Sequence, residues 1–138
     1  MEYQEFIRRV QEQAGLDSPE RAEEVTRATL ETLGERLERK VKDGVAAQLP
    51  GELKTFLLQR DQDSIGYELQ EFYNRVGARA GTKLYEAAEN AKAVVAVLKQ
   101  AVSEGEIQNL RSGLPQDYRG LFDPQTRGPG FPSLDRSG

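Results

Sequence analysis

Five glutamates between residues 23 and 38 are the side chains of this sequence best suited to hold a metal ion. Carboxylate oxygens bind hard cations such as Mg²⁺ and Ca²⁺, and Glu31 and Glu35 are four positions apart, which places them on one face of a helix. Arginines are interleaved with them, however, and Glu35 precedes Arg39 at the spacing of a favourable surface ion pair. We therefore expect a solvated charged face here rather than a metal site. The glutamates are Glu23, Glu24, Glu31, Glu35 and Glu38.

Basic residues gather at the end of the same segment and could contact the phosphates of a nucleic acid. They could equally complement the negative C-terminal end of a helix dipole. Acidic residues lie among them and the whole chain has a formal net charge of -4, whereas phosphate binding needs several uncompensated cations. The pattern disfavours nucleic acid as a partner but leaves the cluster as a possible interaction surface. Its members are Arg36, Arg39, Lys40 and Lys42.

Two further arginines, Arg9 and Arg75, occupy equivalent positions in two similar stretches of sequence. A duplicated arginine could bind an anion or a carboxylate of a partner. The alternative is an arginine whose stem is buried and whose guanidinium pairs with an acid of the adjacent helix, and the sequence favours this alternative. Tyr118 is expected to pack where Leu53 packs in the first stretch, with its hydroxyl at the surface.

The chain contains no histidine and no cysteine. These residues are the usual zinc ligands and the usual carriers of protons near neutral pH. Their absence excludes zinc sites, Ser-His-Asp triads and Cys-His dyads within the chain. We therefore expect no enzyme and no cofactor.

An internal repeat must position these residues. The segment from Phe6 to Gly15 aligns with the segment from Phe72 to Gly81, with Phe, Arg, Val, Ala and Gly at matching positions. With one residue deleted from the second copy, the apolar pattern continues, and each copy closes on a Leu-Pro step, at Pro50 and at Pro115. This predicts an all-α fold, a compact bundle of about eight helices built from two tandem four-helix repeats.

Helix boundaries can be read within each copy. The first helix carries apolar residues at steps of three and four and is stopped by Gly15, or by Gly81 in the second copy. A second helix starts at Ser18 and Pro19, a side-chain cap followed by proline. Gly34, inside that helix, indicates either the close approach of another helix or a kink.

The segment 87–102 is apolar around much of its circumference, so we expect it at the centre of the domain or in the interface of a homodimer. Residues 59–64 are polar and predict a linker, followed by a helix that begins near Ile65. We divide the chain into a single helical domain, 1–122, with repeat one at 1–60 and repeat two at 61–122. The tail, 123–138, is rich in proline and glycine and is predicted to be disordered.

Several phrases of the sequence resemble a bacterial family of uncharacterised helical proteins, the domain of unknown function numbered 2267. The resemblance extends over roughly Met1 to Phe122 and implies a helical fold and a bacterial origin, but no activity, ligand or catalytic residue. The phrases are Leu33-Gly34-Glu35-Arg36-Leu37, Ala46-Ala47-Gln48-Leu49-Pro50, Ser103-Glu104-Gly105-Glu106 and the stretch from Leu114-Pro115 through Tyr118-Arg119 to Leu121-Phe122.

The functional prediction rests mainly on what the sequence lacks. We expect a non-enzymatic protein-interaction or regulatory module of a bacterial cell, with an unidentified protein as its partner. A weak DNA-binding module that imitates a helix-turn-helix is the alternative. The longest apolar run, 93–98, is far shorter than the roughly 20 residues that cross a membrane, and the first residues do not resemble a secretory signal. A cytoplasmic location is therefore expected.

Overall fold

Eight α-helices and one short 3-10 turn form the part of the chain that the computed structural model describes, residues 1–60 and 62–123. No strand occurs within these residues, so the predicted all-α class is confirmed. Of the predicted tail, all but Asp123 lies outside the described residues. The helices are α1 (Tyr3–Ala14), α2 (Pro19–Arg36), α3 (Arg39–Ala46), α4 (Gly51–Leu58), α5 (Leu69–Ala80), α6 (Leu84–Ala101), α7 (Glu104–Ser112) and α8 (Arg119–Phe122), with the 3-10 turn at Gln116–Tyr118.

The ends of the long helices follow the predicted signals. Gly15 and Gly81 adopt left-handed conformations with φ of 66° and 71°, and so end α1 and α5 as predicted. At the start of α2, the Ser18 hydroxyl accepts a hydrogen bond from the backbone N–H of Arg21 at 3.1 Å, and Pro19 is the first helical residue.

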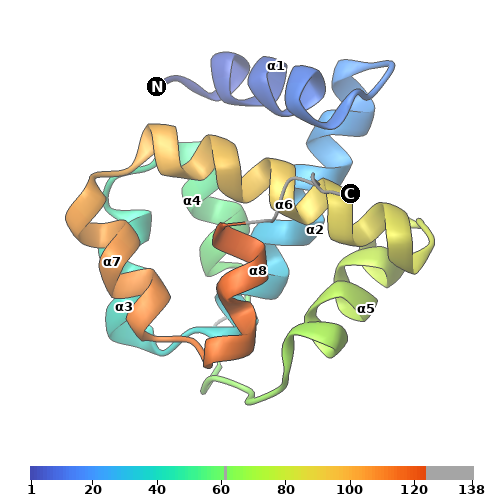
Figure 1. The fold of residues 1–138 in the computed structure, drawn as a ribbon. Coiled ribbons are helices and arrows are strands. Elements are labelled where there is room, and N and C mark those ends of the chain that lie inside the picture. Colours follow the sequence, from blue (N-terminus) through green and yellow to red (C-terminus); the bar gives the residue numbers. More distant parts are fainter. Residues whose placement is uncertain (61, 124–138) are drawn as a thin grey trace, which may run out of the picture.

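Two helices, α2 and α6, form the centre of the bundle. The helix α2 packs against α1, α4, α5 and α6, while α6 also packs against α1, α5 and α8 (Figure 1). The helices α3 and α7 lie side by side at one edge (Figure 1). The valines of α6 and Leu98 are buried within one chain. The apolar character of 87–102 is thus explained without a second subunit.

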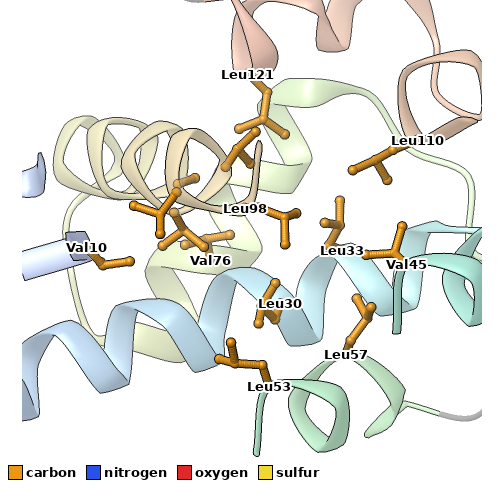
Figure 2. Close-up of a cluster of buried hydrophobic side chains, with 14 of the residues drawn as sticks. Val10, Leu30, Leu33, Val45, Leu53, Leu57, Val76, Leu98, Leu110 and Leu121 are labelled. Carbon is orange, nitrogen blue, oxygen red and sulfur yellow. The ribbon is translucent and has the colours of Figure 1, made fainter. Parts of the chain in front are cut away.

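Leucines of α2 form the middle of the core. Leu30 and Leu33 are fully buried and lie between Leu53 and Leu57 of α4 on one side and Leu98 of α6 on the other (Figure 2). The packing of α4 on α2 explains why residue 34 is glycine, because a Cβ atom there would lie 1.9 Å from the carbonyl oxygen of Leu57 in α4. The close approach of another helix, one of the two predicted explanations, is therefore correct.

The connection between α4 and α5 differs from the prediction. The helix expected near Ile65 begins only at Leu69, and the residues before it are not helical and contact the end of α2. The backbone N–H of Ile65 donates to the carbonyl oxygen of Glu35 at 3.1 Å, which ties this segment to the end of α2. We call residues 62–68 the strap.

Candidate functional site

The carboxylate of Glu35 on α2 is the centre of the largest polar cluster in the described part of the chain. Glu35 is only 4% exposed, and both of its oxygens accept hydrogen bonds. Arg75 donates to Oε1 at 2.9 Å, Arg79 to Oε2 at 2.9 Å, and the Tyr67 hydroxyl to Oε1 at 2.9 Å. The predicted solvated position of Glu35, and its surface pair with Arg39, are therefore wrong. Glu35 is instead the shared counter-ion of two arginines.

Helix α5 supplies both arginines from one face. Arg75 and Arg79 are one helical turn apart, and α5 packs directly on α2. Arg79 also donates to the Thr32 hydroxyl at 2.8 Å, so its guanidinium bridges two residues of α2. The start of α5 is capped from elsewhere in the chain, because the carboxylate of Asp117 accepts a 2.7 Å hydrogen bond from the backbone N–H of Leu69.

The strap closes the cluster with Tyr67. The guanidinium carbon of Arg75 lies 4.4 Å from the centre of the Tyr67 ring, and the guanidinium carbon of Arg36 lies 5.8 Å from the same centre. The carbonyl oxygen of Tyr67 accepts hydrogen bonds from Arg36 Nε at 3.0 Å and from the Tyr118 hydroxyl at 2.8 Å. Tyr118 is 1% exposed, so the prediction of a surface hydroxyl is wrong.

Protonation in the cluster is fixed over a wide pH range. Burial by itself would raise the pKa of Glu35, but the hydrogen bonds from Arg79, Arg75 and Tyr67 outweigh it and lower the pKa to about 2. Burial and the bond to Glu35 raise the pKa of Tyr67, and burial raises the pKa of Tyr118 to about 12. These three groups therefore do not exchange protons near neutral pH, and none of them is suited to act as a general acid or base there.

A shallow hollow of about 680 Å³ lies beside the cluster on the surface. Tyr67 and Arg36 belong both to the cluster and to the hollow, so a molecule bound in the hollow would contact side chains that are already held in place. Its lining residues are Arg36, Gly66, Tyr67, Glu68, Gln70, Glu71, Asn74 and Pro115.

The structure brings together two of the six predicted interaction residues, Arg36 and Arg75. Arg75 pairs with Glu71 of its own helix at 2.8 Å and with Glu35 of the adjacent helix, as the favoured interpretation predicted. Arg9 lies elsewhere, on α1, where it pairs with Glu5 at 2.6 Å and donates to Gln100 on α6 at 2.5 Å.

The remaining predicted residues are divided between core and surface. Lys42 is 1% exposed, and its ammonium group donates to the carbonyl oxygens of Gly34 at 3.0 Å and Arg60 at 3.1 Å. It therefore caps the C-terminal end of α2 from inside the protein and presents no charge to the surface. Arg39 and Lys40 are exposed at the start of α3.

Sequence reasoning missed Arg79 and Tyr67. A usable signal for Arg79 was present, because Arg75 and Arg79 are like charges at a four-residue spacing, which is destabilising unless a counter-ion lies between them. The acid that meets this need, Glu35, was assigned to the solvent. No comparable signal identified Tyr67, since it lies in a stretch without periodicity.

Comparison with known protein families shows to which family the chain belongs. A family model described as an uncharacterized conserved protein (DUF2267) matches residues 3–121. The chain belongs to this family. The predicted resemblance is thereby confirmed over almost the predicted extent. None of the curated proteins matches the sequence significantly.

The described part of this DUF2267 domain comprises residues 1–60 and 62–123. No group of three or more acidic, histidine or cysteine side chains is placed to hold a metal ion in this part. No helix in the same residues is long and apolar enough to span a membrane. The hollow beside the Glu35 cluster is the candidate functional site, because Tyr67 and Arg36 belong both to it and to the cluster.

Proposed function

We propose that this protein is a cytoplasmic, non-enzymatic protein-interaction or regulatory module of a bacterial cell, and that the hollow beside Tyr67 is its contact surface. One observation carries the proposal: Tyr67 and Arg36, which line the hollow, are held in place by hydrogen bonds and by the contact of the Arg36 guanidinium with the Tyr67 ring. A surface fixed in this way loses little side-chain entropy when a partner binds.

The composition of the hollow supports binding by a protein. Tyrosine and arginine are among the residue types enriched at the energetic centres of interfaces, and Tyr67 and Arg36 both line the hollow. Gln70 and Asn74 are exposed on its rim and could donate and accept hydrogen bonds. At about 680 Å³, it has room for several side chains of a partner.

Site-specific cross-linking tests the proposal. A photoreactive residue at Gln70 should give a covalent adduct with one defined protein in the native cell, whereas the same residue at exposed Glu12 on α1 should not. A second control at Tyr85, which is 77% exposed at the start of α6, tests whether the most exposed aromatic side chain of the described residues is used instead. Adducts with chaperones alone, or equal adducts at all three positions, would contradict the proposal.

The DNA-binding alternative gains no support from the basic cluster. Lys42 is buried and Arg36 is bound to Tyr67, which leaves Arg39 and Lys40 as the exposed cations of the four. Retardation of mixed-sequence DNA at low salt that disappears as salt rises would favour this alternative over the protein partner.

We also infer that the bundle consists of two tandem four-helix repeats, 1–60 and 61–122. In support, α1 and α5 are both 12 residues long, and α2 and α6 are both 18 residues long. The first helix of each half also packs against the second helix of the other half, as a pseudo-two-fold arrangement requires. Separate sequence profiles of the two halves, built from many family members, should match each other if this inference is correct.

A further inference from the structure

A small pocket between α7 and α8 shares Pro115 with the hollow as a lining residue. Its volume is about 210 Å³, below the roughly 300–1,000 Å³ of typical small-molecule sites, so it fits a group about the size of one side chain. Leu114, Pro115 and Phe122 make part of its lining apolar. The residues around it are completed by Arg111, Gln116, Tyr118 and Arg119.

Two guanidinium groups and no carboxylate line this pocket. Arg111 lies with its guanidinium carbon 5.5 Å from the centre of the Phe122 ring and is paired with Asp123. Its Nε atom is buried and has no hydrogen-bond partner within the described residues. Asp123 also accepts a hydrogen bond from Lys99 at 3.5 Å, so two cations share this one acid.

Arg119 is the group most available to a ligand. It is exposed, and within residues 1–60 and 62–123 its side chain forms no hydrogen bond or ion pair. The neighbouring acid, Asp117, is turned towards α5, where it accepts the hydrogen bond from Leu69. The guanidinium of Arg119 is therefore free to bind a carboxylate next to an apolar pocket.

We propose that this pocket binds a peptide segment of a partner protein in which a bulky apolar side chain is followed by acidic residues. The apolar side chain would fill the pocket, and a carboxylate would pair with Arg119 at its edge. The proposal rests on the proposed function in one respect, that the ligand is a protein. The chain's own segment 124–138 fits less well, because it contains Arg127 and Arg136 and only one acid, Asp135.

Fluorescence anisotropy with the full chain tests this proposal. The probes are three labelled peptides that present Phe-Glu-Glu, Phe-Lys-Lys or Ala-Glu-Glu in the same glycine-serine context. The Phe-Glu-Glu peptide should bind most tightly. Arg119→Glu should weaken its binding about tenfold and should reverse the preference in favour of Phe-Lys-Lys. Arg119→Lys should retain most of the binding.

Control variants separate this effect from unfolding and from net charge. The side chain of Arg8 on α1 is 58% exposed. The variant Arg8→Glu changes the net charge by the same amount as Arg119→Glu but at a position away from the pocket, so it should leave the binding unchanged. Because the Arg119 side chain is exposed and forms no hydrogen bond or ion pair within the described residues, Arg119→Glu should keep the wild-type circular dichroism spectrum and melting temperature. Equal binding of the three peptides, or an equal loss in the Arg8 variant, overturns the proposal.

Two other occupants would also overturn it. If an unlabelled peptide of residues 124–138 competes as well as Phe-Glu-Glu does, the pocket serves the chain's own segment. If sedimentation shows a concentration-dependent dimer and the anisotropy changes in parallel with the amount of dimer, a second copy of the chain occupies the pocket. The cross-link at Gln70 is independent of all these outcomes, so failure of the pocket and failure of the proposed function are distinguishable.

Discussion

The contact of α5 with α2 and the contact of α1 with α6 have the same plan but different chemistry. In each, an arginine pairs with a glutamate four residues earlier on its own helix, Arg75 with Glu71 and Arg9 with Glu5. Each arginine then reaches across to the long helix opposite. Arg75 donates a hydrogen bond to the buried carboxylate of Glu35, whereas Arg9 donates one to the side-chain amide of Gln100, an exposed residue.

The difference lies in how much charge is buried. A carboxylate that leaves water must be compensated by several donors, and Glu35 has two arginines and a tyrosine. At the contact of Arg9, the amide of Gln100 needs no counter-ion, and Gln13 stands where the second half has Arg79. The same backbone plan therefore carries a buried ionic lock at one interface and an ordinary surface contact at the other.

The largest effect is expected from Glu35→Gln, which removes the shared counter-ion while keeping the shape of the side chain. Arg79 would then lose its counter-ion and Arg75 would keep only Glu71, so the free energy of unfolding should fall by about 3–5 kcal/mol. Urea denaturation followed by circular dichroism measures this. Gln100→Ala is the matched control and should change the stability by less than about 1 kcal/mol. Similar losses in the two variants would show that the interfaces do not differ.

The second-largest effect is expected from acid, which should weaken the α2–α5 contact and so lower the free energy of unfolding. The pKa of Glu35 is lowered in the folded protein from 4.5 to about 2, so its contribution is complete above pH 4.5 and is lost as the pH falls towards 2. The shift corresponds to about 3 kcal/mol. Unfolding free energies measured from pH 5 to pH 2 should show this loss in the wild type. In Glu35→Gln the corresponding part of the slope should be absent.

A smaller effect is expected from Arg79→Gln, which gives the second half the residue that the first half has at Gln13. Glu35 would keep Arg75 and Tyr67 but lose one charged donor, which should lower the free energy of unfolding by about 1.5–3 kcal/mol. Thermal and urea unfolding measure the loss. Gln13→Ala should have almost no effect, and a loss as large as that of Arg79→Gln would contradict the comparison.

The smallest effect is expected at Arg9. Its side chain is 39% exposed, so Arg9→Ala should lower the free energy of unfolding by less than about 1 kcal/mol. A double-mutant cycle sharpens the comparison: the coupling energy of Arg75 with Glu35 should clearly exceed that of Arg9 with Gln100. Equal coupling energies would contradict the proposed difference between the two contacts.

Local signals predicted most of the fold. Gly15, Ser18, Pro19 and Gly81 act through backbone geometry close to their own positions, and the helix ends follow them. The strap could not be predicted in this way. Ile65 and Tyr67 are held by hydrogen bonds to groups distant in the sequence, such as the Glu35 carbonyl and the Tyr118 hydroxyl.

The candidate site was predicted only in part, for the same reason. Arg36 and Arg75 were singled out, but the depth of a charged side chain depends on the helix packed over it. Glu35 and Lys42 have the sequence surroundings of surface residues, yet α5 covers the first and the carbonyl oxygens of Gly34 and Arg60 bind the second. Periodicity alone does not distinguish a buried ion from an exposed one.

The crossed packing of the halves has a consequence for how the protein acquires its structure. Arg9 and Gln100, which meet at the α1–α6 contact, are 91 residues apart in the sequence, and Arg75 and Glu35 are 40 apart. Stabilising contacts of such separation give a helical protein a high contact order, and folding rates fall as contact order rises. During synthesis, the apolar face of α1 therefore has no α6 to cover it until most of the chain has left the ribosome. We expect this protein to fold late and slowly for a helical bundle.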